Sequence, residues 1–528
     1  MYFTEHFSDQ EIAILNKYFT NVDKPVFAII NLPEVVKGAL FARYSRSDKS
    51  LRRLFLDEFL SKDSNIIDSE LDKNNFDSTR AEKLYDRVFS EYGDDSVAQL
   101  GAAHVACEQS SNILTKILER GRLSSYLEQS TRYIFYDKKD SQDNYNYFIP
   151  KEIINSKSHK NYKNVINESF NDYSIIVRKL YNYLLSKYPN VNNDSEFIYK
   201  STIRAKACDG ARGILPASTK SNVGIFASGQ SFERMIISMN SHDLIEVRDY
   251  AKMLLEELRK VIPSFLKRVD LKDRGIVWSD YFRSNRQSME DISNILGNNI
   301  DSVEEVDLID WDKESENKII SSALYPYTSF SESQIKKYVK NLNLEEKRNI
   351  MEKFIGNRLN RRHIPGRGLE NSFYRFDILS DYGSFRDLQR HRMLTIDWQK
   401  LTIEHGYNTP DIISEINETN RWEKSMSRCS NLFDEIKSKH GGYVSQYAVP
   451  FAFKFRYIMQ MNAREAFHIL ELRTSRQGHP DYRRICQKMH SLIKEKAGHK
   501  LLANAMKYVD YNEYDLERLE AQRKSNKI

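Results

Sequence analysis

The densest group of chemically useful side chains in the sequence lies between Arg120 and Tyr133. This stretch holds three arginines, four serine or threonine hydroxyls and one carboxylate, that of Glu128. Arginine forks and hydroxyl groups are what a phosphate site requires. Glu and Gln side chains can contact the polar edge of a base or a sugar hydroxyl. A solvated loop with helix caps has the same composition, and on composition alone it is the more common outcome.

Two further groups of this kind occur late in the chain. In 389–392 (Gln-Arg-His-Arg), two arginines flank a histidine and could clamp a diphosphate and touch a ring. In 462–473, a predicted helix places Arg464 and His468 four residues apart on one face, with Arg473 at or just past its end. Taken singly, a short basic run is usually a solvated face, and the second group is more often a ladder of surface salt bridges.

The composition is that of a globular protein with substantial cores. The chain has 528 residues, 40% of them hydrophobic and 29% charged, and a net charge of +6. That mild excess suits small anionic ligands at least as well as nucleic acid. No apolar run is long enough to predict a membrane span, and the N-terminus lacks a secretory pattern. Four widely spaced cysteines form neither a zinc spacing nor a disulfide framework, so we expect a cytoplasmic protein without a metal site.

Hydrophobic periodicity predicts the elements that position these groups. Residues 164–270 are mainly amphipathic helices, most clearly over 244–258. The alternation in 372–379 predicts a strand, and the spacing in 456–472 predicts a helix. Residues 284–318 are acidic and polar, so we take them as a linker. The predicted division is therefore a first domain over 1–283, a linker over 284–318 and a second domain over 319–528.

A weak internal repeat supports this division. Arg120-Gly121-Arg122 has a later partner in Arg390-His391-Arg392, and Leu215-Pro216 has one in Val449-Pro450. The matches are short, but they occur in the same order in both halves. This order indicates a tandem duplication.

Together these stretches resemble the flavin-dependent thymidylate synthases. That family carries the signature Arg-His-Arg, seven residues, then Ser, usually continuing as Glu-x-Ser-x-Arg-Tyr. In the first half Arg120, Arg122 and the residues 128–133 fall in register, and Arg212 precedes a Leu-Pro landmark. However, Gly121 replaces the signature histidine, and Ser228-Gly229-Gln230 replaces an Asn-Ala-Arg motif that belongs to flavin binding in the family.

The second half departs from the family in the opposite sense. Its Arg-His-Arg and its Asn462-Ala463-Arg464 are intact, with His468 and Arg473 in register. Its signature serine is Lys400, its signature glutamate is Trp398, and Gln446 replaces the arginine before Leu-Pro. In the family each active site is shared between subunits. The losses follow that division, so the first half keeps the nucleotide loop and the second keeps the flavin contacts.

The resemblance implies an α/β (α+β) fold of two tandem thymidylate synthase-like domains, each a small sheet with long packed helices. It implies conversion of dUMP to dTMP with methylenetetrahydrofolate as carbon donor, reduced FAD as hydride source and NADPH as reductant. Arg473 would be the catalytic residue. The implied dUMP contacts are Glu128, Gln129, Ser130, Thr131, Arg132, Arg212, Gln389, Arg390 and Arg473. The implied cofactor contacts are Arg390, His391, Arg392, Asn462, Ala463, Arg464, His468, Glu128 and His363.

The resemblance further implies small-molecule partners, an internal pseudo-dimer that could pair again as a homodimer, and neither a membrane nor a nucleic-acid partner. Two other interpretations remain open. A degenerate homologue would bind nucleotide or flavin without turnover. A nucleic-acid-binding protein, suggested by the basic balance and 31 tyrosines, would bind long polyanions in a salt-sensitive way.

Overall fold

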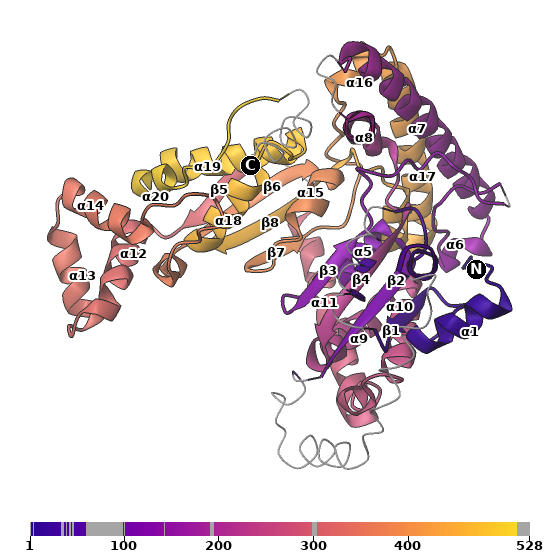
Figure 1. Cartoon of the computed structure of the whole chain (residues 1–528), viewed down its shortest axis with the longest axis horizontal. Coiled ribbons are helices and arrows are strands. Elements are labelled where there is room, and N and C mark those ends of the chain that lie inside the picture. The colour runs from indigo at the N-terminus through magenta and orange to yellow at the C-terminus, as the bar shows by residue number, and fades with distance from the viewer. Residues whose placement is uncertain are drawn as a thin grey trace. The chain divides into compact units, whose positions relative to one another are not determined.

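Helices and strands alternate along the chain, and the strands form two four-stranded antiparallel sheets (Figure 1). The computed structural model describes residues 2–3, 5–32, 36–37, 40–41, 44, 47–59, 99, 101–141, 143–190, 195–297 and 304–514. Within that part of the chain no helix is long and apolar enough to cross a membrane.

The α-helices of the first half are α1 (Asp9–Tyr18), α3 (Leu51–Leu54), α5 (Asn112–Leu118), α6 (Lys151–Ile154), α7 (His159–Lys187), α8 (Glu196–Ala211), α9 (Gly229–Asn240), α10 (Ile245–Leu258) and α11 (Val277–Ser293). Those of the second half are α12 (Ser315–Leu324), α13 (Glu332–Asn341), α14 (Leu344–Ile355), α15 (Tyr382–Leu388), α16 (Asp411–Glu415), α17 (Thr419–Ser445), α18 (Ala463–Arg473), α19 (Pro480–Glu495) and α20 (Lys500–Ala505). Short 3-10 or π turns are η1 (Phe55–Phe59), η5 (Arg212–Ile214), η6 (Pro263–Leu266), η7 (Lys272–Ile276), η8 (Asn294–Leu296), η9 (Tyr325–Tyr327), η10 (Arg367–Asn371) and η11 (Gln446–Ala448). Helix α10 confirms the prediction over 244–258.

The chain folds into two compact units, and neither is continuous in sequence. The first comprises 1–179, 214–299 and 413–450, and the second comprises 180–213, 300–412 and 451–528. Each unit therefore includes one helical segment from the other half of the sequence. The division at 284–318 stays a prediction about the duplicated halves. Those residues include the end of α11, strand β5 and the start of α12.

The two sheets have the same topology. In the first unit β1 (Val26–Ile29), β2 (Ala102–Ser111), β3 (Ser124–Glu128) and β4 (Lys220–Ser228) pair in the order β1-β2-β4-β3. In the second unit β5 (Val306–Trp311), β6 (Phe373–Asp381), β7 (Leu394–Trp398) and β8 (Lys454–Asn462) pair in the order β5-β6-β8-β7. All pairs are antiparallel. The shared order supports the duplication that the short repeats suggested.

Strand β6 confirms the prediction over 372–379, but the helix predicted over 456–472 is wrong in its first part. Residues 454–462 form β8, and α18 begins only at Ala463. Burial alternates strictly along β8, with Phe455, Tyr457, Met459 and Met461 buried. This alternation matches the period of a half-buried strand, and pairing with β6 and β7 outweighed the helical spacing read from the sequence.

Each central strand runs directly into a helix through a capping residue. Ser111, Ser228, Asp381 and Asn462 each end a strand and also accept a hydrogen bond from a backbone N–H in the first turn of the next helix. Such caps satisfy an otherwise unpaired donor and fix where the helix begins. The four junctions fix how far along each helix the residues of the signature motifs lie from the end of the preceding strand.

Exchanged segments complete each unit. In the first unit α17 lies beside α7, where Arg421 and Arg428 both pair with the Asp172 carboxylate. The N–H of Ser218 donates to the carbonyl of Tyr447 at 3.1 Å there. In the second unit the equivalent bond, from the N–H of Ala452 to the carbonyl of Gly213, is 2.9 Å. The segment of η5 and the segment of η11 therefore have equivalent backbone partners.

A buried carboxyl group, that of Glu246 on α10, ties the first unit together. It accepts hydrogen bonds from the N–H and hydroxyl of Ser111 at 2.8 and 2.7 Å and from the hydroxyl of Tyr447 at 2.6 Å. Burial raises its pKa to about 7 from the usual 4.5, although these hydrogen bonds act in the opposite direction. The folded state consequently holds an extra proton between those two pH values.

We expect the stability of the wild-type protein to fall as pH rises across that window, because the folded state binds more protons there than the unfolded state. The contribution is on the order of 3 kcal/mol. The variant Glu246→Gln stays neutral at every pH. The melting temperature of this variant minus that of the wild type should therefore increase between pH 5 and pH 8. The matched control is Glu256→Gln on the exposed face of α10. A constant difference between Glu246→Gln and the wild type would contradict the assigned pKa.

Candidate active site

A buried carboxylate in the second unit faces two guanidinium groups. Asp387, on α15, lies 3.7 Å from Nη1 of Arg212 and 3.8 Å from Nη1 of Arg473. Arg212 begins η5 and comes from the first half of the sequence, whereas Arg473 ends α18 and comes from the second. The fold thus brings together two arginines that the resemblance assigned to dUMP binding, one of which, Arg473, it also assigned to catalysis.

Arg212 is built into this site. Only 4% of its surface is exposed, and it packs over Gly383, where an added Cβ would lie 3.4 Å from its Nε and Nη2. Among the residues that the structure describes, its Nη2 has no hydrogen-bond partner. A buried donor without a partner costs free energy, and a phosphate oxygen would satisfy it. The side chain therefore fits an anionic ligand.

Asp381 adds a second carboxyl group near Arg212. The pKa of Asp381 is raised to about 6, because burial and the negative charge of Asp481 raise it by more than Arg212 lowers it. Its two carboxylate oxygens accept from the N–H and the hydroxyl of Ser384 at 2.9 and 2.7 Å. Asp381 therefore serves as the cap that holds the first turn of α15, and with it Asp387, in place.

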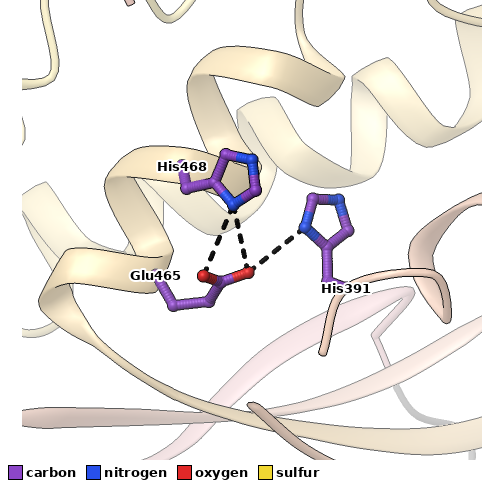
Figure 2. A group of neighbouring side chains, drawn as sticks. All are labelled: His391, Glu465 and His468. Atoms are coloured by element: carbon purple, nitrogen blue, oxygen red, sulfur yellow. Dashed lines mark hydrogen bonds and ion pairs between the residues drawn. The ribbon is translucent and has the colours of Figure 1, made fainter. Parts of the chain in front are cut away.

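His391 links Arg473 to α18. Its Nε2 accepts a hydrogen bond from Nε of Arg473 at 2.9 Å, and its Nδ1 lies 3.2 Å from Oε1 of Glu465 (Figure 2). His468 also faces the Glu465 carboxylate, at 3.4 Å. Burial lowers the pKa of His391 to about 4, and the neighbouring Arg473 charge acts in the same direction. His391 is therefore neutral at physiological pH.

The ligand atoms of His391, Glu465 and His468 all lie within 4.8 Å of one another, a spacing that a metal ion could use. The hydrogen bond from Arg473 opposes this use. An arginine N–H only donates, so Nε2 of neutral His391 must be the acceptor and the proton must sit on Nδ1. That nitrogen then donates to Glu465 and offers no lone pair to a cation.

The remaining predicted cofactor residues differ in their exposure and in their contacts. Arg390 and Arg392 are exposed on either side of buried His391. Asn462 caps α18 through its Oδ1, Ala463 is fully buried, and Arg464 donates to the carbonyl of Pro365 at 3.0 Å. His363 is exposed, and Gln389, predicted to contact dUMP, is buried at the end of α15.

The predicted nucleotide loop belongs to the first unit. The Glu128 carboxylate accepts from Nζ of buried Lys116 at 2.9 Å, and Gln129 donates to the carbonyl of Ser47 at 2.7 Å. Ser130 accepts from the N–H of Arg132 at 3.2 Å, and Thr131 is buried. Residues 124–128 of this stretch form β3 and anchor it to the sheet, whereas Arg120, Arg122 and Leu123 before the strand are exposed.

Comparison with known proteins shows the family of this chain. The sequence profile described as thymidylate synthase complementing protein matches residues 42–264 and again 307–498. This chain belongs to the thymidylate synthase complementing protein family. It is 35% identical to a UPF0159 protein of Chlamydia pneumoniae over 98% of this chain and 97% of that protein. It is 32% identical to a UPF0159 protein of Thermoplasma acidophilum over 93% and 98%. A protein of Clostridium tetani named flavin-dependent thymidylate synthase is 27% identical over 33% of this chain and 66% of that protein.

The two matches to the thymidylate synthase complementing protein family allow the two copies to be compared position by position. The capping residues align the helices, so the charged set, namely Asp387, Glu465 and Arg473 with the neutral imidazole of His391, can be compared with the first copy. The corresponding residues there are Ile117, Ser231, Met239 and Gly121. The first copy has thus lost every charge of this set. At Gly121 a Cβ would lie 2.5 Å from the Tyr126 hydroxyl, so that space is already filled.

Sequence reasoning did not identify Asp387 and Glu465 as site residues. Both carried a usable signal, because Asp387 lies three residues before Arg390 and Glu465 lies three residues after the capping Asn462. These spacings place each carboxylate within one helical turn of a predicted site residue. Neither residue belongs to the quoted motifs, and only the fold shows that they face His391, Arg212 and Arg473.

We expect Asp387→Asn to destabilise the protein and to strengthen anion binding. Removing the carboxylate takes away an ion-pair partner that two poorly solvated guanidinium groups share, which costs on the order of 1–3 kcal/mol. Inorganic phosphate should then raise the melting temperature more than it does in the wild type, with roughly tenfold tighter binding. Asp310→Asn, at an exposed position of β5, is the control. Unchanged phosphate affinity would show that Asp387 does not oppose an anion site.

Proposed function

We propose that the chain is an FAD-dependent thymidylate synthase that converts dUMP to dTMP, with methylenetetrahydrofolate as carbon donor and reduced flavin as hydride source. The observation that carries the proposal is the meeting of Arg212 and Arg473 at Asp387. The first arginine comes from the half that keeps the nucleotide loop, and the second comes from the half that keeps the flavin motifs. Decay of one copy would not by itself bring them together.

The side chains of the second unit suit FAD in charge and in the kinds of group they present. Exposed Arg390 and Arg392 suit a diphosphate, and the exposed edge of His468 beside buried His391 suits a flat ring system. These residues, with Asn462, Arg464 and His363, would hold the cofactor. When bound and reduced, FAD would supply the hydride that the protein itself cannot provide. NADPH is the proposed source of those electrons.

The protein would act by binding and by electrostatics. Arg212 would bind the dUMP phosphate through its buried guanidinium. Besides Arg473, the other dUMP contacts that the resemblance implies are Glu128, Gln129, Ser130, Thr131 and Arg132 of the first unit and Gln389 and Arg390 of the second. Arg473 would stabilise negative charge that develops on the pyrimidine ring as C5 attacks the carbon donor. A preorganised cation in a poorly solvated site lowers the transition-state energy more than it would in water.

The cysteines support a route that needs no thiolate nucleophile. All four are buried. Burial raises the pKa of Cys429 to about 11 and that of Cys486 to about 12, so these thiols stay protonated at neutral pH. Nucleophilic catalysis by cysteine requires the thiolate.

The proposal predicts a yellow protein that releases tritium from 5-tritiated dUMP when folate donor and NADPH are present. The non-catalytic alternative predicts bound flavin without tritium release. The nucleic-acid alternative predicts neither, and instead salt-sensitive binding to long polyanions.

The two copies offer a matched test of the flavin site. His468 on α18 and Arg234 on α9 stand at the same distance from their capping residues, and both are exposed. We expect His468→Ala to weaken FAD retention, because it removes a ring and a hydrogen-bonding group, whereas Arg234→Ala should not. Flavin content per chain after gel filtration measures both variants. Equal losses would place the flavin outside the second copy.

Mixing two full-length variants tests whether the site forms within one chain. Arg212→Ala and Arg473→Ala should each reduce tritium release by roughly ten- to a hundredfold, because each removes a charge-assisted contact. We expect no recovery on mixing, since both arginines face one Asp387 in one compact unit and fusion favours the intramolecular contact. Substantial recovery would show that sites form between chains.

A further inference from the structure

Three side chains form a continuous hydrogen-bonded row beside the proposed reaction site. Glu465, in the first turn of α18, faces Nδ1 of His391, and Nε2 of His391 faces Nε of Arg473 in the last turn of the same helix. Figure 2 shows Glu465 and His468 on one helix and His391 on a separate segment, with a ring nitrogen of His391 facing the Glu465 carboxylate. Glu465 and His391 are each 7% exposed, so water competes little for these bonds.

The chemistry of the groups fixes the direction of both hydrogen bonds. The Arg473 guanidinium only donates and the ionised Glu465 carboxylate only accepts, so His391 must accept at Nε2 and donate at Nδ1. In the other tautomer an N–H of His391 would face an N–H of Arg473, and a bare nitrogen would face the carboxylate. A carboxylate partner is a common device for selecting one histidine tautomer.

The charges around His391 agree with this arrangement. The titratable or charged groups facing it are Glu465, His468 and Arg473, and Asp387 lies on the far side of Arg473. Burial would raise the pKa of Glu465, but hydrogen bonds from the two histidines lower it to about 2. At neutral pH the row therefore consists of a carboxylate, a neutral imidazole and a guanidinium.

We propose that Glu465 is a positioning residue for Arg473, acting through His391: it selects the tautomer that accepts Nε of Arg473 and so aims the guanidinium at the substrate. The inference rests on the proposed function in one respect, the role of Arg473 at the pyrimidine. With Nε bound to His391 and Nη1 near Asp387, the orientation of the planar group is fixed. The first copy lacks all three members of the row, with Ser231, Gly121 and Met239 in their places.

The test compares Glu465→Gln with Glu465→Ala. The glutamine carbonyl can still accept from Nδ1 of His391, whereas alanine removes the acceptor. Both substitutions leave the helix cap intact, because Asn462 accepts from the backbone N–H of residue 465. Ser231→Ala, at the matched position of α9, is the control.

The first measurement does not depend on activity. Long-range proton–nitrogen NMR of histidine-labelled full-length protein reports which ring nitrogen of His391 carries the proton, and His391→Asn assigns the signal. We expect the Nδ1–H tautomer in the wild type, Glu465→Gln and Ser231→Ala, and a mixture or the Nε2–H tautomer in Glu465→Ala. The same tautomer in all four proteins would overturn the proposal.

The second measurement is turnover at saturating FAD. Glu465→Ala should lower kcat by roughly ten- to a hundredfold with a smaller change in KM for dUMP, and Glu465→Gln should recover most of the loss. Equal loss in both variants, together with a stoichiometric divalent metal in the wild type alone, would identify a metal site instead and overturn the proposal. A third outcome separates the two proposals. If Glu465→Ala changes the His391 tautomer but the wild type shows no turnover, the positioning role is retained and the proposed function is rejected.

Discussion

The balance of charge at Asp387 is the constraint on which the second unit depends. Two guanidinium groups, from Arg212 and Arg473, lie largely out of water, and such groups are costly to bury unless a carboxylate is near. Asp381 provides a second carboxyl group near Arg212. The buried Nη2 of Arg212 keeps hydrogen-bonding capacity for a ligand, and the side chain of Arg473 needs the further support of His391 and Glu465. A buried donor of this kind is what the proposed anion site requires.

The duplicated fold explains how one copy could keep this arrangement while the other lost it. Both copies retain the same sheet order and the same strand-to-helix caps, which supply stability independently of the site. In the first copy, apolar or small residues replace the charged set. Its buried charges are satisfied internally, since Lys116 pairs with Glu119 at 2.5 Å and Glu128 at 2.9 Å. Pairing and hydrogen bonding of this kind offset the cost of burying these charges.

Exchange of helical segments brings residues of both halves of the sequence into each unit. Residues 180–213 belong by sequence to the first half, yet they fold with the second unit and bring Arg212 to Asp387. Residues 413–450 do the converse and bring Tyr447 to Glu246. In each case a polar side chain from one half meets a buried carboxyl group of the other. Neither unit can therefore be built from one half of the sequence alone.

The sequence by itself determined the family, the duplication and the residues that carry the proposed chemistry, because these depend on motifs with fixed spacing. It also determined elements with clear periodicity, such as α10 and β6. The tertiary structure decided the rest. It made 454–462 a strand through pairing with β6 and β7, and it assigned Arg212 to the second unit. It also showed what Asp387 and Glu465 face. Their spacing in the sequence places them within one helical turn of predicted site residues, but the partner of a charge depends on which chain segments pack together.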